Sequence, residues 1–209
     1  SHTRRRGIIA FNGGYHGRTL MTMGMTGKIT PYKNLFGPFP AEIYHAPFPI
    51  EYHGISVEDS LKALNNLFIC DIAPSDVAAI IVEPIQGEGG VSVLPPECLI
   101  GLRKLCDENN MLLIFDEVQC GFLRSGKMFA HQWSGVEPDI MTTAKAIANG
   151  FPLGACLTSK KVGDVMDHGS HGSTYGGNPL AVAVGNAVLD LMLKEEFIEQ
   201  LNKISEYLL

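Results

Sequence analysis

Short apolar runs alternate with longer amphipathic stretches along most of this chain. Apolar runs bounded by turn-forming residues are typical of buried strands, and they lie at residues 7–11, 77–82, 111–118 and 154–158. Apolar residues at helical spacing predict helices over residues 16–26, 57–69, 96–109, 179–193 and 197–209. Residues 30–54 are rich in Pro, Gly and aromatic residues and are expected to form a long ordered loop. This alternation predicts an α/β domain with a mainly parallel sheet flanked by helices.

Polar or glycine-rich segments follow three of the predicted strands, at residues 12–16, 83–90 and 116–119. In open α/β sheets, ligands bind at the carboxyl ends of the strands. We therefore expect these three segments to converge on one site. The convergence follows from the predicted topology, because no single segment identifies a ligand.

The composition is that of a globular protein. Hydrophobic residues make up 45% of the 209 residues and charged residues 18%, which is enough for one domain with a sizeable core. The net charge of −6 argues against a nucleic-acid partner, because phosphate binding needs clustered Lys and Arg. Arg4–Arg6 is the one basic run, and we expect it to be the solvated end of a helix already under way at Ser1. No apolar run approaches the roughly 18 residues of a membrane span, so no membrane partner is expected.

The cysteine and histidine residues suggest neither a disulfide framework nor a metal site. The five cysteines are an odd set without a C-x-x-C pair, and the histidines show no metal-ligand spacing. A reducing compartment fits this set. We therefore expect no metal ion, and a cytoplasmic protein, or one of the mitochondrial matrix if the source is eukaryotic.

Lys145 and Asp116 offer the clearest chemistry. Lys145 is a lone amine among small and apolar residues, where burial would lower its pKa, and Asp116 ends an apolar run. A lysine that can form an imine and an acid that can keep a pyridine nitrogen protonated are the two groups that a pyridoxal phosphate enzyme needs. Glu117 adds a second acid at a buried strand end, where acids need partners. Structural alternatives remain, since Asp116 could cap a turn and Lys145 could lie on the surface.

Five motifs in a fixed order extend this interpretation. They are Tyr15–Thr19, Glu83–Gly90, Asp116–Gln119, Lys145 and Thr174–Pro179. In order and spacing the chain resembles the class III aminotransferases of pyridoxal phosphate fold type I. Phe11–Thr19 and His53–Ser56 are most similar to the bacterial 4-aminobutyrate aminotransferases of that family. Its acetylornithine and ornithine aminotransferases share the core motifs, so they remain alternatives.

The resemblance implies a role for each cofactor residue. Lys145 would bind pyridoxal 5'-phosphate as an imine and shuttle a proton, and Asp116 would pair with the pyridine nitrogen. Tyr15 would stack on one face of the ring and Val118 on the other, while Gln119 would hydrogen-bond near the phenolic oxygen. These roles suit the side chains, because an aromatic face can stack and an amide can donate.

Four further residues complete the implied site. His16 is placed among the cofactor-binding residues, and Thr174 would reach the phosphate of the neighbouring subunit, which implies a homodimer. Arg18 would bind the substrate carboxylate, since a guanidinium grips a carboxylate with two hydrogen bonds. Glu88 would pair with an arginine from a C-terminal domain and release it when 2-oxoglutarate binds.

The resemblance implies an enzyme that moves the amino group of 4-aminobutyrate to 2-oxoglutarate, giving succinate semialdehyde and glutamate. The chain lacks an initiator Met, the family's Gly-Ser or Ser-Gly phosphate loop before the first strand, and the C-terminal arginine. We therefore expect residues 1–209 to be the cofactor-binding large domain, a fragment without the upstream phosphate loop and the C-terminal small domain. Such a fragment would have little activity alone. A catalytically inert large-domain remnant is the remaining alternative.

Overall fold

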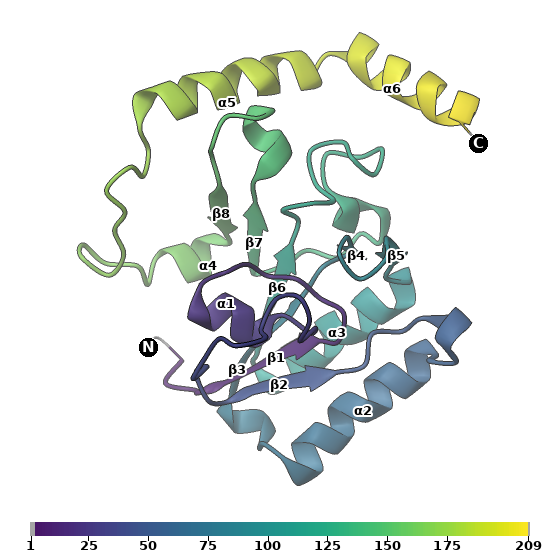
Figure 1. Ribbon diagram of the computed structural model, residues 1–209, viewed down its shortest axis with the longest axis vertical. Coiled ribbons are helices and arrows are strands. Elements are labelled where there is room, and N and C mark those ends of the chain that lie inside the picture. Colours follow the sequence, from purple (N-terminus) through teal and green to yellow (C-terminus); the bar gives the residue numbers. More distant parts are fainter. Residues whose placement is uncertain (1–2, 209) are drawn as a thin grey trace.

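The computed structural model describes residues 3–208, which form an α/β fold around a central sheet (Figure 1). Within these residues the sheet has six strands in the order β2-β1-β3-β6-β7-β8. Neighbouring strands are parallel except for β7 and β8, which are antiparallel. The strands are β1 (Gly7–Phe11), β2 (Ile43–Ala46), β3 (Val77–Val82), β6 (Leu112–Asp116), β7 (Ile140–Thr143) and β8 (Ala155–Thr158), and a separate hairpin pairs β4 (Ile85–Gln86) with β5 (Ser92–Val93).

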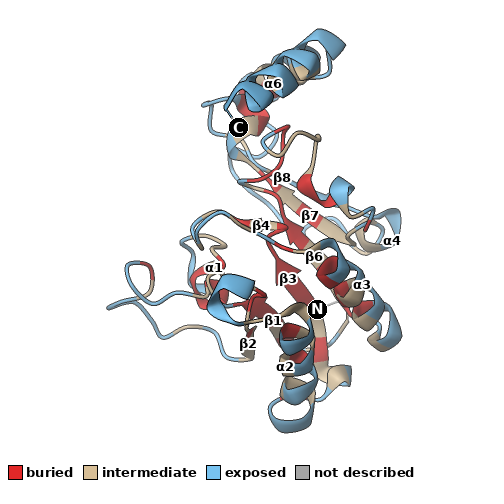
Figure 2. Ribbon diagram, turned by 90° about the vertical axis from the view of Figure 1, so that its right-hand side faces the viewer, coloured by how far each residue is buried: buried red, intermediate tan, exposed pale blue. Residues whose placement is uncertain are grey.

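Helices cover both faces of the sheet. In Figure 2, α2 and α3 lie on one face and α1 lies on the other. The α-helices are α1 (Leu20–Met25), α2 (Val57–Cys70), α3 (Pro96–Asn109), α4 (Lys160–Gly163), α5 (Pro179–Met192) and α6 (Glu195–Leu208). Short 3₁₀ helices are η1 (Glu51–His53), η2 (Pro74–Asp76), η3 (Ala130–Trp133) and η4 (Lys145–Ala148). The predicted α/β class with a mainly parallel sheet is confirmed.

The main core lies between the sheet and the pair α2 and α3. On α3, apolar residues at positions 98, 102 and 106 recur every four residues, so they share the face that packs on the sheet. Ile80 and Leu113 from neighbouring strands meet this face. The fully buried side chains of this core include Phe11, Leu64, Ile80, Leu102, Leu113 and Phe115.

Two local predictions were wrong in extent. The helix expected over 16–26 begins only at Leu20, because Gly17 has a φ of 128° and Thr19 is the N-cap in an extended conformation. The segment expected to be a loop over 30–54 contains β2, a strand on the edge of the sheet. Its four residues alternate too briefly to stand out from their surroundings in sequence.

The interpretation of the basic run as a helix end was also wrong. Thr3 to Arg6 are not helical, whereas Ser1 and His2 lie outside the described residues. The Arg5 guanidinium donates to the carbonyl oxygens of Val77 and Asn109, and Arg6 forms ion pairs with acids beside the sheet. These arginines therefore fasten the start of the chain to the ends of β3 and α3.

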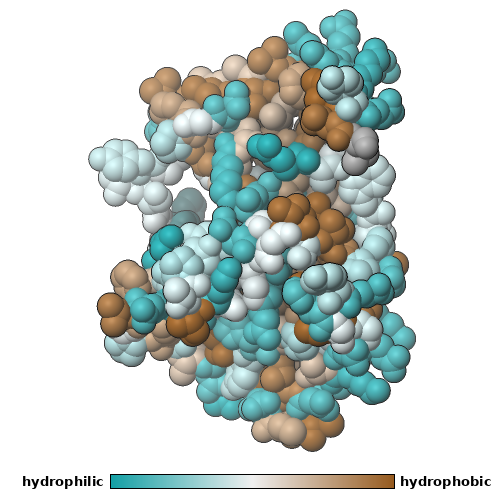
Figure 3. All heavy atoms as spheres, turned by 45° about the vertical axis from the view of Figure 1, so that its right-hand side comes forward, coloured by the Kyte–Doolittle hydropathy of each residue, from teal (hydrophilic) through white to brown (hydrophobic). Residues whose placement is uncertain are grey.

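Helix α5 has apolar side chains that are exposed to solvent. In Figure 3, apolar atoms gather at the upper edge of the molecule, over α5. On this helix Leu180 is 63% exposed and Leu191 is 56% exposed, while Ala181 is buried. Across residues 3–208, no helix combines the length and apolar character that crossing a membrane requires.

The core position of Leu102 yields a prediction about stability. Replacing Leu102, which is fully buried, by Ala should lower the free energy of unfolding by about 2–5 kcal/mol, because the lost side chain leaves a cavity. Ile100→Ala on the same helix is the matched control, since Ile100 is 54% exposed and its loss should change stability by about 0.5 kcal/mol or less. Denaturant titration measures both, and equal effects would contradict the assigned core.

Candidate active site

The carboxyl ends of the central strands surround a small cavity. Its volume is about 110 Å³, and its lining comes from the segments that follow β1, β3, β6 and β7. The three segments that sequence analysis expected to converge therefore do so. The lining residues are Tyr15, His16, Gly17, Glu83, Asp116, Val118, Gln119 and Lys145.

Asp116 is held in one orientation by three donors. Its Oδ2 lies 2.8 Å from Nδ1 of His16, and its Oδ1 accepts from the Val118 N–H and the Thr142 hydroxyl, each at 3.2 Å. The side chains of His16 and Asp116 are 2% and 8% exposed. A carboxylate has about four acceptor sites on its two oxygens, so these three contacts fix its orientation and leave room for a further donor.

The partnership of His16 with Asp116 was not predicted from sequence. The two residues are 100 positions apart, so no local pattern joins them. The family resemblance implies that His16 binds the cofactor, and the structure adds its contact with Asp116. The Thr142 contact was missed for the same reason, because it depends on the pairing of β6 with β7.

Glu83 joins two of the loops that form the cavity. Its Oε1 accepts from the Tyr15 N–H at 2.8 Å, and its Oε2 accepts from the Gly87 N–H at 3.2 Å. Burial raises the pKa of this carboxyl group above its ordinary value, and the two hydrogen bonds offset only part of the increase. Glu83 therefore fixes the backbone of Tyr15 next to the glycine-rich loop.

Glu117, the next residue, has protein partners in the segment that follows β6. Its carboxylate accepts from the backbone N–H groups of Ala130 and His131, from the His131 ring at 3.0 Å and from the Cys120 thiol. Burial raises its pKa, but these hydrogen bonds together outweigh burial and leave the pKa lowered. The second acid therefore braces the turn at residues 120–131 and does not need a ligand.

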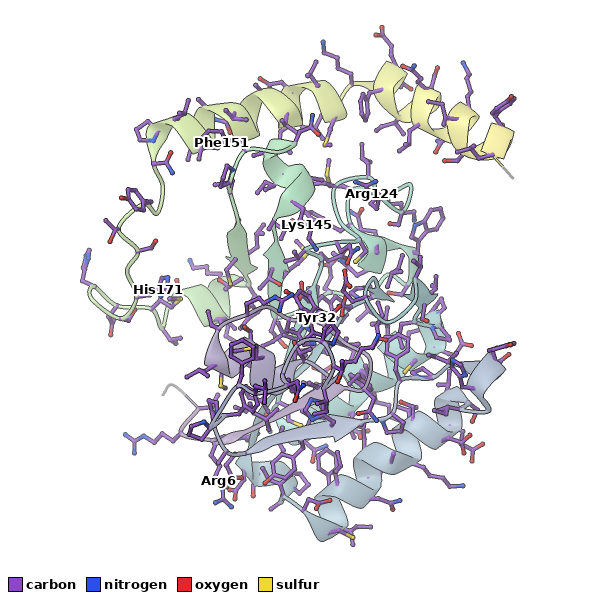
Figure 4. All side chains as sticks on the ribbon, viewed as in Figure 1. Arg6, Tyr32, Arg124, Lys145, Phe151 and His171 are labelled. Atoms are coloured by element: carbon purple, nitrogen blue, oxygen red, sulfur yellow. The ribbon has the colours of Figure 1, made fainter. Side chains whose placement is uncertain are left out.

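Lys145 opens onto the cavity from the first residue of η4. Its φ is 50°, in the left-handed region, and the residue is exposed, so the expected burial of this amine is wrong for the described chain. The apolar residues that follow it, Ile147 and Ala148, are buried. Its side chain lines both the small cavity and a neighbouring one, and Figure 4 shows it in the middle of the molecule, below Arg124.

The second cavity has a volume of about 490 Å³ and shares Gln119 and Lys145 with the first. Its lining is partly apolar, and Arg124 supplies a cation. A ligand bound at Asp116 in the small cavity would therefore lie next to the Lys145 amine, which also lines the larger cavity. The lining residues are Ile85, Gly87, Val91, Gln119, Cys120, Arg124, Lys145 and Ala146.

Arg18 and Glu88 lie beside the small cavity. Both contact Tyr32, a residue that the sequence did not single out. The guanidinium carbon of Arg18 is 6.0 Å from the centre of the Tyr15 ring and 5.3 Å from that of Tyr32. The Tyr32 hydroxyl donates to Glu88 Oε2 at 2.6 Å. Tyr32 lies in the segment predicted only as a loop, so its sequence position gave no signal.

Three predicted site residues line neither cavity: Arg18 and Glu88, which lie beside the small one, and Thr174. Thr174 is exposed, in the long connection between α4 and α5 that extends away from the sheet in Figure 1. Among residues 3–208, no cluster of His, Cys, Asp or Glu could hold a metal ion. The lining of the small cavity includes one amine, Lys145, and two buried carboxyl groups, Asp116 and Glu83.

Two solved structures with this fold are aminotransferases. A solved ornithine aminotransferase from Toxoplasma gondii superposes with a TM-score of 0.78 at 38% identity, covering 92% of this chain and 42% of that one. An aminotransferase from Bacillus anthracis superposes with a TM-score of 0.89 at 30% identity, covering 99% of this chain and 48% of that one. The sequence matches the aminotransferase class-III family over residues 1–209, and the chain belongs to that family.

Over the residues that match, two bacterial relatives are a little under half identical to this chain. A 5-aminovalerate aminotransferase from Pseudomonas putida is 46% identical over 206 residues, which are 99% of this chain and 48% of the relative. The 4-aminobutyrate aminotransferase of Escherichia coli is 43% identical over the same extent of both chains. The chain spans about half the length of these relatives.

The hydrogen bonds of Glu117 yield a prediction about pH and stability. Glu117→Gln should lower the free energy of unfolding at pH 7 by about 2–3 kcal/mol, because an amide nitrogen would face the backbone donors. Since the folded-state pKa is lowered, the carboxylate stabilises the fold above its unfolded pKa of about 4.3, and this contribution is lost as pH falls through the lower folded value. The difference between variant and wild type should therefore shrink below about pH 4.

Glu137→Gln is the control for this measurement, because the Glu137 side chain is 85% exposed and lies 3.8 Å from the His131 ring. Denaturant titration from pH 3 to pH 7 should show little change for that variant. A Glu117→Gln effect that stayed constant down to pH 3 would show that the carboxylate charge is not what stabilises the turn.

Proposed function

We propose that the full-length protein is a pyridoxal phosphate-dependent aminotransferase that converts 4-aminobutyrate and 2-oxoglutarate into succinate semialdehyde and glutamate. The observation that carries this proposal is the placement of Asp116, fixed by His16 and Thr142, on the same cavity as Lys145. Membership of the class III family supports the reaction type, and the Escherichia coli relative supports the substrate.

The residues present suit this cofactor. Asp116 offers an oriented carboxyl group with acceptor sites to spare, and a protonated ring nitrogen requires an acceptor of this kind. The solved ornithine aminotransferase from Toxoplasma gondii is described with partial occupancy of pyridoxal phosphate at its active site. When bound, the cofactor supplies an electron-poor ring that accepts the electron pair of the C–H bond next to the substrate amine.

The protein side chains do the remaining work. The Lys145 amine would hold the cofactor between turnovers and would accept the proton that leaves the carbon next to the substrate amine. Tyr15 and Val118, which both line the small cavity, would flank the ring, and Gln119 would donate near its phenolic oxygen. His16 would act through Asp116, because its contact with Oδ2 fixes the orientation of the carboxyl group that would face the ring nitrogen.

The substrate would be bound outside the small cavity by its charged end. Arg18 is exposed beside Tyr15, so its guanidinium can receive a carboxylate while the amine at the other end of the substrate reaches Lys145. Glu88 lies on the far side of Tyr32 and would serve the dicarboxylic acceptor. An ω-amino acid, with a carboxylate and a terminal amine, matches this arrangement.

5-Aminovalerate is the second candidate donor, because the relative from Pseudomonas putida acts on it by name and is 46% identical. It differs from 4-aminobutyrate by one methylene group, which an apolar pocket distinguishes by only about 1–3 kcal/mol. Ornithine and acetylornithine donors remain alternatives of the same class. An inert remnant is less well supported, because Lys145, Asp116 and Arg18 are present together with the hydrogen bonds that orient the acid.

The proposal includes a homodimer, in which Thr174 reaches the phosphate of the neighbouring site. Its support is that Thr174 is exposed and distant from the cavities of its own chain, and that α5 presents apolar side chains. The described residues would form the cofactor domain, so the 209-residue chain alone would show little turnover. Its cysteines are free, which suits a cytoplasmic or matrix location.

The direct test is an assay of the full-length protein with added cofactor. Succinate semialdehyde should form from 4-aminobutyrate and 2-oxoglutarate, with kcat/KM values compared for 5-aminovalerate and acetylornithine. A higher kcat/KM for another donor would change the substrate and keep the reaction class. No transfer from any of these amines would overturn the proposed function.

Lys145 should be the lysine that binds the cofactor. Borohydride reduction of the loaded protein should fix the cofactor to the peptide that contains Lys145, because this amine opens onto the cavity beside Asp116. Peptide mass mapping measures the label. Lys145→Arg should abolish it and Lys160→Arg, a change on α4, should leave it unaltered; a label on another lysine would refute the assignment.

Arg18 should determine affinity for the donor. Arg18→Ala should raise KM for 4-aminobutyrate by about 30- to 150-fold, equivalent to 2–3 kcal/mol for a lost charge-assisted contact. The absorption spectrum of the bound cofactor should not change, because Arg18 does not line the small cavity. Arg6→Ala removes exposed ion pairs with Glu42 and Asp76 and is the matched control. An unchanged KM in Arg18→Ala would place the carboxylate elsewhere.

A further inference from the structure

Glu83 is a buried acid that lines the small cavity, and the proposed reaction leaves it without a role. The residue is 4% exposed and directly follows β3, so its carboxyl group lies among the segments that surround the cavity. Its Oε1 accepts from the Tyr15 N–H at 2.8 Å, and its Oε2 accepts from the Gly87 N–H at 3.2 Å. Each oxygen thus holds one of two loops, the one after β1 and the one after β3.

Both loops restrain side chains that are expected to contact the cofactor ring. The Tyr15 side chain lines the small cavity, so a fixed backbone N–H limits where its aromatic ring can lie. Gly87 packs closely on Gln119, because a Cβ atom added to Gly87 would overlap the side-chain amide of Gln119. A fixed Gly87 N–H therefore limits where that amide can lie. One carboxyl group thus restrains two residues of the candidate site.

The charge on Glu83 makes the fold less stable, in contrast to the charge on Glu117. Burial raises the pKa of Glu83, whereas the pKa of Glu117 is lowered by its hydrogen bonds in spite of burial. Because the folded-state pKa is raised, the stabilising contribution of Glu83 is present below its unfolded pKa of about 4.3 and is lost as pH rises through the folded value. Stability of the fold therefore does not explain an acid at this position, which suits a residue that serves the site.

We propose that Glu83 is a positioning residue that holds Tyr15 and, through Gly87, Gln119 in the arrangement that binds the cofactor ring. The inference deepens the proposed function and rests on it, because it needs the cofactor to occupy the small cavity. Only the ionised carboxyl group accepts freely on both oxygens, since protonation turns one oxygen into a donor. The carboxylate is therefore the form that holds both loops.

Glu83→Gln should release one loop and leave the fold intact. Its amide oxygen can accept from one backbone N–H, but its amide nitrogen is a donor and cannot accept from the other. Gln86 keeps the two loops together, because its buried Nε2 donates to the Asn12 carbonyl at 2.9 Å. In the full-length protein without cofactor, amide hydrogen exchange measured by mass spectrometry should be faster at Tyr15 or at Gly87. Unchanged exchange at both residues would overturn the proposal.

The second measurement is the affinity for pyridoxine 5'-phosphate, which has a pyridine ring and a phosphate but no aldehyde that could react with Lys145. Its Kd should rise by about five- to tenfold in Glu83→Gln, because the free protein would populate the binding arrangement only part of the time. In a background of Tyr15→Leu and Gln119→Ala, the same substitution should change the Kd by less than about twofold. An equal loss in that background would overturn the proposal, since Glu83 would then act by another route.

A second variant tests the link to Gln119 without changing the acid. Gly87→Ala adds the Cβ atom that overlaps the Gln119 amide, so it should also raise the Kd of pyridoxine 5'-phosphate. Binding as tight as that of wild type would show that the position of Gly87 does not control Gln119.

The ratio of the Kd values of Glu83→Gln and wild type should depend on pH with a defined sign. It should be largest above the raised pKa of Glu83 and should approach one as pH falls through that pKa, because the wild-type group then also loses an acceptor. Titration of the ligand cancels in this ratio. A ratio that stayed constant between about pH 4 and pH 8, a range that begins near the ordinary pKa of Glu, would overturn the role of the carboxylate. The titratable groups around Glu83, present in both proteins, are Tyr15, His16, Asp116, Cys120 and Lys145.

Asp139→Asn is the matched control, because Asp139 Oδ2 accepts from the Leu113 N–H at 2.8 Å and from Arg103 at 2.9 Å, at the opposite end of the sheet. It should lower stability and leave the Kd of pyridoxine 5'-phosphate unchanged. A rise in Kd equal to that of Glu83→Gln would overturn the proposal, because any lost carboxylate would then have the same effect.

The outcomes separate this inference from the function on which it rests. A wild-type protein that transfers the amine of 4-aminobutyrate, with Glu83→Gln binding pyridoxine 5'-phosphate as tightly as wild type, would overturn the role of Glu83 alone. A wild-type protein that neither binds this ligand nor transfers any ω-amino group would remove the proposed function and this inference together.

Discussion

The parallel pairing of the central strands is the constraint on which the site depends. Val82 on β3 pairs with Phe115 on β6, and Asp116 pairs with Thr142 on β7, so the chain leaves the sheet at nearly the same level on each strand. Backbone hydrogen bonding thus brings together segments that are tens of residues apart in sequence. The packing of α2 and α3 on one face keeps this register rigid, which allows loops at the edge to hold side chains at fixed distances.

Around this edge, buried acids have three different uses. Asp116 is surrounded by donors and keeps room for a ligand, Glu83 joins two loops through backbone N–H groups, and Glu117 closes a turn. The same residue type is therefore structural or functional according to whether the protein satisfies all of its lone pairs. Burial alone would not have distinguished them, because all three are nearly inaccessible to solvent.

The regular elements and the converging segments could be predicted from sequence, because strands such as Val77–Val82 and helices such as Pro96–Asn109 have clear apolar patterns and turn residues at their ends. Edge strand β2 could not be predicted from sequence, since its four residues carry too little periodicity. The contacts of His16 with Asp116 and of Tyr32 with Glu88 could not be predicted from sequence either. They join residues 100 and 56 positions apart, and only the three-dimensional pairing of strands and loops decides such contacts.

The backbone conformation at Lys145 is strained, although the position supplies the amine of the cavity. With a φ of 50°, a residue that has a side chain is held in a conformation that costs about 1 kcal/mol or more and that glycine adopts freely. Glycine would make the turn after β7 easier to form, but it would leave the cavity without its amine. The chain therefore gives up some stability of its fold at the point where the amine must emerge, as enzymes do where chemistry and packing conflict.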